Sequence, residues 1–123
     1  MKLHAALPTD SKVITGYGEG YVLVNRERFQ RSLVVMPERV WTEWGATTFE
    51  ALAEEDFQAL VQLERDVVLL GTGPRLRFPR PEITRALIEA RVGLEVMDVP
   101  AACRTYNILV EEGRKVAAAL LLS

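Results

Sequence analysis

The segment Asp66-Val67-Val68-Leu69-Leu70-Gly71-Thr72-Gly73 predicts the central strand of the fold and the turn that follows it. Its central part, Val67–Leu70, is continuously apolar, which is typical of a strand covered on both faces of a sheet. The glycines that follow break the strand and predict a turn. We therefore expect a central strand over Val67–Leu70, with residues 71–73 forming a turn at its carboxyl end.

Downstream of this turn, helical and strand patterns alternate. Pro81 and Pro100 suit the first turn of a helix, Asp98 is a good N-cap, and Gly113 suits the residue after a helix. Two successive β-α-β units predict parallel strands with right-handed crossovers. The expected elements are a helix from Pro81 to about Ala90, a strand Leu94–Met97, a helix from Asp98 to about Glu112, and a strand from Lys115 or Val116 to Leu122.

Upstream of the central strand, the chain is predicted to be β-structure followed by one helix, Glu54–Arg65. Short turns join the early strands, so antiparallel pairing is expected, and Pro37 ends one strand because proline cannot donate to a ladder. The fold class is therefore α/β, with a mixed central sheet, helices on at least one face and an N-terminal antiparallel β-meander. The strands expected in this half are Val13–Tyr17, Gly20–Val24, Phe29–Met36 and Val40–Trp44.

Length and composition indicate one globular domain. The chain has 123 residues, of which 49% are apolar, and both values are ordinary for a single packed domain. We expect residues 1–123 to form one domain and residues 1–10 to be a flexible tail. The single cysteine, Cys103, cannot form an internal disulfide, which fits a reducing compartment and favours a cytoplasmic location.

Charge and the length of the apolar runs argue against two kinds of partner. The net charge is −2 and the sequence pI is about 5.5, whereas a general nucleic-acid binder usually carries a basic excess. Apolar runs such as Val116–Leu122 are much shorter than the roughly 20 residues of a membrane helix. Met1–Asp10 lacks the apolar core of a secretory signal. We expect neither nucleic-acid binding nor a membrane span.

No group of residues points to a metal ion or a cofactor. His4 is the only histidine, which excludes a site with several histidine ligands. No nucleophile has a base nearby in the sequence, and no carboxylates are paired at a meaningful spacing. Cys103 is expected to be a small core residue rather than a reactive thiol. These features favour a non-catalytic protein without a cofactor.

Two segments could carry a binding site. In open α/β sheets, ligands bind beyond the carboxyl ends of the strands, where Gly71, Thr72 and Gly73 are expected to lie. Glycine amides can approach an anion closely, and the arginine-rich segment Arg75–Arg80 follows. The alternative is a structural turn followed by a solvated basic loop. On the last helix, a polar stripe could line the same cleft or could simply face solvent; the residues concerned are Arg104, Thr105 and Asn107.

Three segments carry a shared pattern: Gly16–Pro37, Asp66–Gly73 and Met97–Leu109. Taken together, they resemble the group called domain of unknown function 498, whose members include a mitochondrial complex I assembly factor and many small bacterial proteins. The resemblance implies a three-layer β/β/α fold and maps the pattern of the group onto Gly71, Thr72, Gly73, Arg104, Thr105 and Asn107. Val99 and Pro100 depart from the small residues usual in the group, and Arg26 stands where glycine is common.

Two functions remain open after this reading. The first is a non-catalytic protein-binding or assembly-factor-like module. The second is a small-molecule or anion site, with or without catalysis, in a cleft between Gly71–Gly73 and Arg104–Asn107. Both hypotheses depend on one spatial expectation, that the glycine turn and the front of the last helix meet at a common rim.

Overall fold

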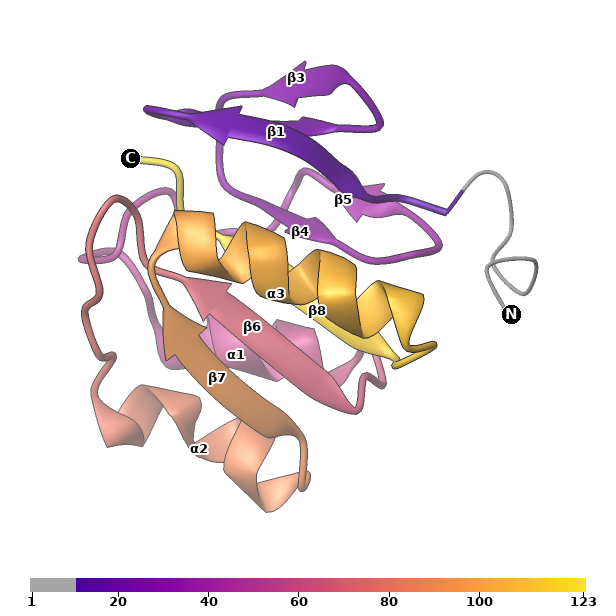
Figure 1. Cartoon of the computed structure of the whole chain (residues 1–123). Helices are drawn as coiled ribbons and strands as arrows, with labels where there is room; N and C mark the ends of the chain where they lie inside the picture. Colours follow the sequence, from indigo (N-terminus) through magenta and orange to yellow (C-terminus); the bar gives the residue numbers. More distant parts are fainter. Residues whose placement is uncertain (1–10) are drawn as a thin grey trace.

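The computed structural model describes residues 11–123, so the predictions for residues 1–10 and His4 lie outside the described range (Figure 1). A mixed five-stranded sheet forms its centre, in the order β5-β4-β8-β6-β7. The inner strand β6 pairs in parallel with β7 and β8, and β4 pairs antiparallel with β8 and β5. These strands are β4 (Leu33–Val35), β5 (Val40–Trp41), β6 (Val67–Gly71), β7 (Gly93–Met97) and β8 (Val116–Leu120).

Helices cover both faces of this sheet, whereas the sequence predicted helices on at least one face. On one face, α1 (Glu54–Val61) packs against α2 (Pro81–Glu89). On the other face lies α3 (Val99–Glu111), together with a small antiparallel sheet (Figure 1). The small sheet consists of β1 (Ile14–Gly18), β2 (Tyr21–Val24) and β3 (Glu27–Phe29). The α/β class, the mixed central sheet and the β/β/α layering are confirmed.

Side chains of β6 enter two hydrophobic cores in alternation. Val67 and Leu69 pack into the core that α3 and the small sheet share, whereas Val68 and Leu70 pack into the core beneath α1 and α2. Successive side chains of a strand point to opposite faces, so a strand buried on both faces must be apolar at every position. The continuous apolar pattern of this segment is thereby explained.

The start and end of α3 follow the sequence signals. The Asp98 carboxylate accepts a hydrogen bond from the backbone amide of Ala101, at 2.8 Å between Oδ1 and nitrogen. Gly113 follows the helix with a φ of 77°, a left-handed conformation that glycine adopts without steric cost. The direction of α3, which leads its first turn back to the end of β6, is therefore fixed by local signals.

The prediction of one strand over Phe29–Met36 is wrong. Phe29 pairs with Val22 in the small sheet, whereas Leu33 pairs with Leu120 in the central sheet. The chain changes sheets between them and bends at residue 31. An apolar stretch predicts extended backbone, but it does not say which strand will be the partner.

Three other expected elements are shorter in the structure; one is the last strand, which ends at Leu120 rather than at Leu122. Only Val40–Trp41 of the expected strand Val40–Trp44 pairs in the sheet. Trp44 instead buries its ring against α1, and its Nε1 donates to the Asp56 carbonyl at 3.0 Å. The helix expected over Glu54–Arg65 ends at Val61. Glu64 adopts a φ of 57°, and such a left-handed residue ends helical geometry.

Candidate functional site

The turn after β6 and the first turn of α3 lie at the same edge of the central sheet. Val99 donates its amide to the Gly73 carbonyl at 2.9 Å, and Thr72 donates its amide to the Met97 carbonyl at 2.9 Å. Leu121, just beyond β8, donates to the Gly71 carbonyl at 2.9 Å. The common rim expected from the sequence is therefore present.

A cavity of about 590 Å³ opens at this rim, and we call it the strand-end groove. It lies where the β1–β2 turn, the β6 turn, the start of α3 and the segment after β8 come together. Most of its lining is apolar, and among the described residues Glu19 is the one charged residue in it. The lining residues are Tyr17, Gly18, Glu19, Gly20, Gly73, Pro74, Val99, Pro100, Leu121, Leu122 and Ser123.

The three predicted turn residues have different surroundings. Gly73 lines the strand-end groove and has a φ of 97°. Gly71 lies under α3, where an added Cβ would come within 2.9 Å of Leu120 Cδ2 and 3.2 Å of Val99 Cγ2. Thr72 is fully buried, and its hydroxyl donates to the Arg75 carbonyl at 2.7 Å. Only Gly73 of the three therefore faces the groove.

The three predicted helix residues are also separated. Arg104 is exposed, and its Nη1 donates to the Tyr17 hydroxyl at 2.9 Å, which connects it to the groove rim. Thr105 and Asn107 are half-buried and do not line the groove. Asn107 instead binds the backbone of β1 through two hydrogen bonds. Its Oδ1 accepts a hydrogen bond from the Ile14 amide at 2.9 Å, and its Nδ2 donates one to the Ile14 carbonyl at 2.8 Å.

Replacing Asn107 with alanine should lower the free energy of unfolding by about 1–3 kcal/mol, because the amide and carbonyl of Ile14 would both lose their partner. Arg104→Ala should change it little, since that side chain is exposed. Urea denaturation measures both values. Asn107→Asp, which keeps an acceptor for the Ile14 amide, should fall between them. Wild-type stability of Asn107→Ala would contradict the structural role.

Cys103 is buried in the core that α3 shares with the small sheet, with 1% of its surface exposed. Burial raises the pKa of its thiol to about 12, and the neighbouring Arg104 guanidinium only partly opposes this. A thiol that stays protonated in an apolar core is a poor nucleophile. The geometry therefore gives Cys103 a packing role.

The raised pKa of Cys103 predicts a loss of stability at alkaline pH. The unfolded thiol ionises near its ordinary pKa of 9.0, whereas the folded thiol stays neutral until about pH 12. Below pH 9 the thiol is neutral in both states, and its contribution to the free energy of unfolding is fully present. As the pH rises from 9 toward 12, only the unfolded thiol ionises, so the free energy of unfolding falls. Urea titrations should show a smaller alkaline loss for Cys103→Ala than for the wild type. Equal losses would rule out this cause.

Residues 11–123 contain neither a cluster of metal-binding side chains nor a membrane-spanning helix. No three histidine, cysteine, aspartate or glutamate side chains gather closely enough there to hold a metal ion. No helix in that range is long and apolar enough to cross a membrane.

Sequence reasoning missed several residues of the groove. Tyr17 and the residues after β8 line it, although neither segment carries a binding motif. The glycines around Tyr17 predict a hairpin turn, but no local signal brings that turn to the start of α3. The contact depends on how the small sheet packs, which is a long-range property of the fold.

The chain is similar in sequence to known proteins over most of its length. A family model described as "Protein of unknown function (DUF498/DUF598)" matches residues 14–121. The Bos taurus NADH dehydrogenase (ubiquinone) 1 alpha subcomplex assembly factor 3 is 33% identical over 110 residues, which cover 88% of this chain and 59% of that protein. The Homo sapiens protein of the same name is 29% identical with the same coverage. The chain thus spans about three fifths of these relatives.

Solved structures share the fold over nearly the whole chain. A crystal structure of a Bordetella parapertussis protein has 39% identity and a TM-score of 0.86, covering 94% of this chain and 98% of that one. An NMR structure of a Xanthomonas campestris protein has 33% identity and a TM-score of 0.84, with coverages of 99% and 92%. A Mth938-like domain from Bordetella pertussis has 34% identity and a TM-score of 0.81, also with coverages of 99% and 92%.

Proposed function

Because this chain belongs to the DUF498/DUF598 family of proteins of unknown function, we propose that it is a non-catalytic, assembly-factor-like module. In this proposal, the strand-end groove holds an apolar segment of a protein partner. Its curated relatives include proteins named assembly factor 3 of NADH dehydrogenase, which supports an assembly-type role. The matched region covers 59% of those proteins, so their own partners are not transferred to this chain.

The observation that carries this proposal is the chemistry of the groove lining. A site for a small polar substrate usually contains several convergent polar side chains. Here the lining is mostly apolar, and it includes three glycines that leave the backbone open to close approach. An extended peptide with apolar side chains matches such a surface better than a polar metabolite does.

Tyr17 and Arg104 form the polar rim of the groove. Tyr17 is 39% exposed, and Arg104 holds its hydroxyl at 2.9 Å. A tyrosine that is fixed in place loses little conformational entropy when a partner covers it, which is why tyrosine is common at binding hot spots. We assign Arg104 the role of positioning Tyr17, and Gly73 that of forming the opposite wall.

Pro100→Glu is the variant that tests the groove. It places a carboxylate in the apolar lining, and a charge buried there without a partner opposes binding of an apolar segment. The fold should tolerate the change, because acidic residues are favourable in the first turn of a helix. Ile108→Glu is the matched control: it replaces a residue that is 56% exposed, later on the same helix and outside the groove lining.

The experiment is affinity capture from native lysate under crosslinking, with mass spectrometry and a thermal melt of each variant. Wild type and Ile108→Glu should recover the same stoichiometric partner, and Pro100→Glu should lose it by about tenfold or more, equivalent to at least 1.4 kcal/mol. Recovery of no stoichiometric partner by the wild type would reject the proposal. Equal recovery by Pro100→Glu would also reject it.

A second candidate is a small anionic ligand at the same edge, bound by Arg104 and by Gly73, the turn residue that faces the groove. Among the described residues Arg104 forms no ion pair, so its charge is available to an anion. Phosphate, carboxylates and nucleotides would then shift the amide NMR signals of the turn, and Arg104→Ala would abolish the shifts. Unmoved signals would exclude these ligands.

A cytoplasmic location and the lack of nucleic-acid binding remain predictions from composition and charge. A test of the second is a gel-shift assay with duplex DNA and single-stranded RNA at low salt, where phosphate contacts are strongest. Retention of either at micromolar protein would contradict the prediction. Fractionation of cells that carry the native protein tests the location.

A further inference from the structure

The loop between β6 and α2 alternates arginine with exposed apolar side chains. Its sequence is Arg75-Leu76-Arg77-Phe78-Pro79-Arg80, and we call it the basic loop. Phe78 is 71% exposed and Leu76 is 48% exposed, two of the most exposed large apolar residues in the described chain. Neighbouring exposed apolar and charged residues are typical of an interaction surface rather than of a solvated connection.

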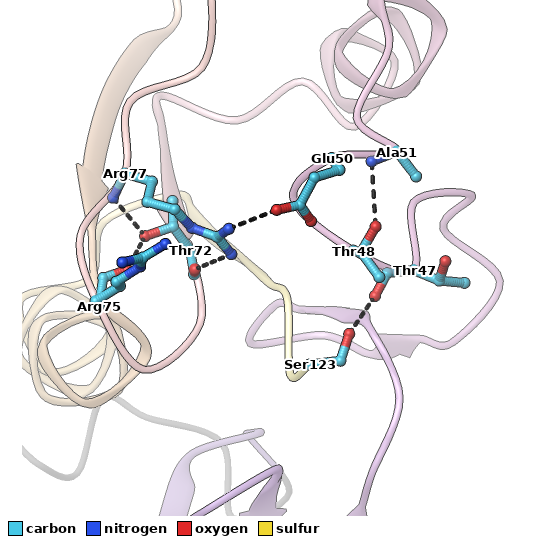
Figure 2. Close-up of polar contacts among 8 residues, drawn as sticks. All are labelled: Thr47, Thr48, Glu50, Ala51, Thr72, Arg75, Arg77 and Ser123. Atoms are coloured by element: carbon cyan, nitrogen blue, oxygen red, sulfur yellow. Dashed lines mark hydrogen bonds and ion pairs between the residues drawn. The ribbon is translucent and has the colours of Figure 1, made fainter.

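Arg77 fixes the conformation of this loop (Figure 2). Its guanidinium lies 4.5 Å from the centre of the Phe49 ring. Its Nη1 donates to Glu50 Oε2 at 2.8 Å, and its Nη2 donates to the Thr72 carbonyl at 3.2 Å. The hydroxyl of Thr72 also accepts a hydrogen bond from the backbone amide of Arg77, at 3.1 Å. The loop therefore has a defined conformation, which both backbone and side-chain contacts of Arg77 stabilise.

A second cavity, of about 410 Å³, lies between the basic loop and the segment around Phe49, and we call it the loop cavity. It is hollowed between apolar side chains, and cationic side chains stand around it. It is separate from the strand-end groove, since the two share no lining residue. The lining residues are Phe49, Glu50, Leu52, Arg75, Arg77, Phe78, Pro79, Arg80 and Ile83.

Charge around the loop cavity is opposite in sign to that of the whole chain. The chain carries a net charge of −2, yet three arginines fall within the basic loop. Arg77 is paired with Glu50, and Arg75 attracts the same carboxylate at longer range. Arg75 and Arg80 are both exposed, and neither forms an ion pair within residues 11–123. Two guanidinium groups beside the cavity are thus available to carboxylates of another molecule.

We propose that the loop cavity docks an acidic segment of a partner protein, with one apolar side chain in the cavity and flanking carboxylates on Arg75 and Arg80. Arginine forks match carboxylate geometry, and the hollow is large enough to admit an apolar side chain. A hollow of about 410 Å³, which can take up a side chain, favours a peptide over a flat anionic lipid surface. This surface is independent of the strand-end groove and does not rest on the proposed function.

The test uses a short fluorescein-labelled peptide, made of glutamate and aspartate around one central leucine, and the intact protein. Fluorescence anisotropy measures binding at low salt, and amide NMR shifts locate it. The double variant Arg75→Glu/Arg80→Glu should weaken binding by about tenfold or more, because two attractions become repulsions. Arg91→Glu/Arg114→Glu makes the same charge change at two exposed residues elsewhere and should weaken it much less.

Further outcomes separate the cavity from general charge attraction. A peptide with alanine in place of leucine should bind more weakly, and Phe78→Ser should reduce the preference for leucine. Pro100→Glu should bind like the wild type, which keeps this surface distinct from the groove. Equal weakening by both double variants would overturn the proposal, as would no binding. Sedimentation with phosphatidylglycerol vesicles without peptide binding would also overturn it, in favour of a lipid surface.

Discussion

Replacing Tyr106 with alanine is expected to lower the free energy of unfolding by about 3–5 kcal/mol, the range for removing a large aromatic side chain from a core. Tyr106 is fully buried on α3 and belongs to the core shared by α3, the small sheet and the central sheet. Its hydroxyl donates to the Lys12 carbonyl at 2.8 Å, just before β1. Its removal leaves a cavity where the layers meet, and urea denaturation measures the loss.

The control variant is Tyr106→Phe, which keeps the ring and removes only the hydroxyl. We expect a loss of about 1 kcal/mol, the usual net value of one hydrogen bond. The difference between the two variants then measures how much the packed ring contributes. A loss as small for alanine as for phenylalanine would mean that the small sheet is not held on α3 in this way.

Thr72→Val is expected to cost about 2–4 kcal/mol. A buried group left without a partner costs about 1–3 kcal/mol; two groups lose theirs here, and their partly buried position keeps the total in the lower part of the summed range. The hydroxyl of Thr72 donates to the Arg75 carbonyl and accepts from the Arg77 amide. Valine has nearly the same shape but provides neither interaction. The loss should also loosen the turn between the strand-end groove and the basic loop, so faster amide exchange is expected at residues 73–80.

Thr72→Ser keeps the hydroxyl and should retain most of the stability, with only a methyl group lost from the core. Thermal or urea unfolding compares the two variants, and hydrogen exchange locates the loosened segment. If Thr72→Val unfolds like the wild type, the hydrogen bonds shown in Figure 2 do not hold this loop in solution.

Local sequence signals account for the second half of the fold. The apolar run over Val67–Leu70, the Asp98 cap and Gly113 each dictate structure within a few residues of themselves. Two β-α-β connections then leave little topological freedom, because such crossovers are right-handed. The strand-end position of Gly73 and the start of α3 followed from the same reasoning.

Long-range packing decided what the sequence did not reveal. Phe29 and Leu33 belong to one apolar stretch, but they pair with strands of different sheets. Helical spacing places Asn107 on the polar stripe of α3, yet its side chain binds the backbone of Ile14, 93 residues away. Similarly, the Tyr17 turn reaches the groove only because the small sheet packs on α3. Patterns that depend on periodicity carry no information about such distant partners.

Site-specific photocrosslinking in cells would show whether the strand-end groove receives a segment of a partner protein. Benzoylphenylalanine would replace Tyr17 at the groove rim or, as a control, Ile88, which is 63% exposed on α2. We expect one defined protein adduct from position 17, absent from position 88 and lost with Pro100→Glu. Adducts from position 88 alone, or none from either position, would contradict it.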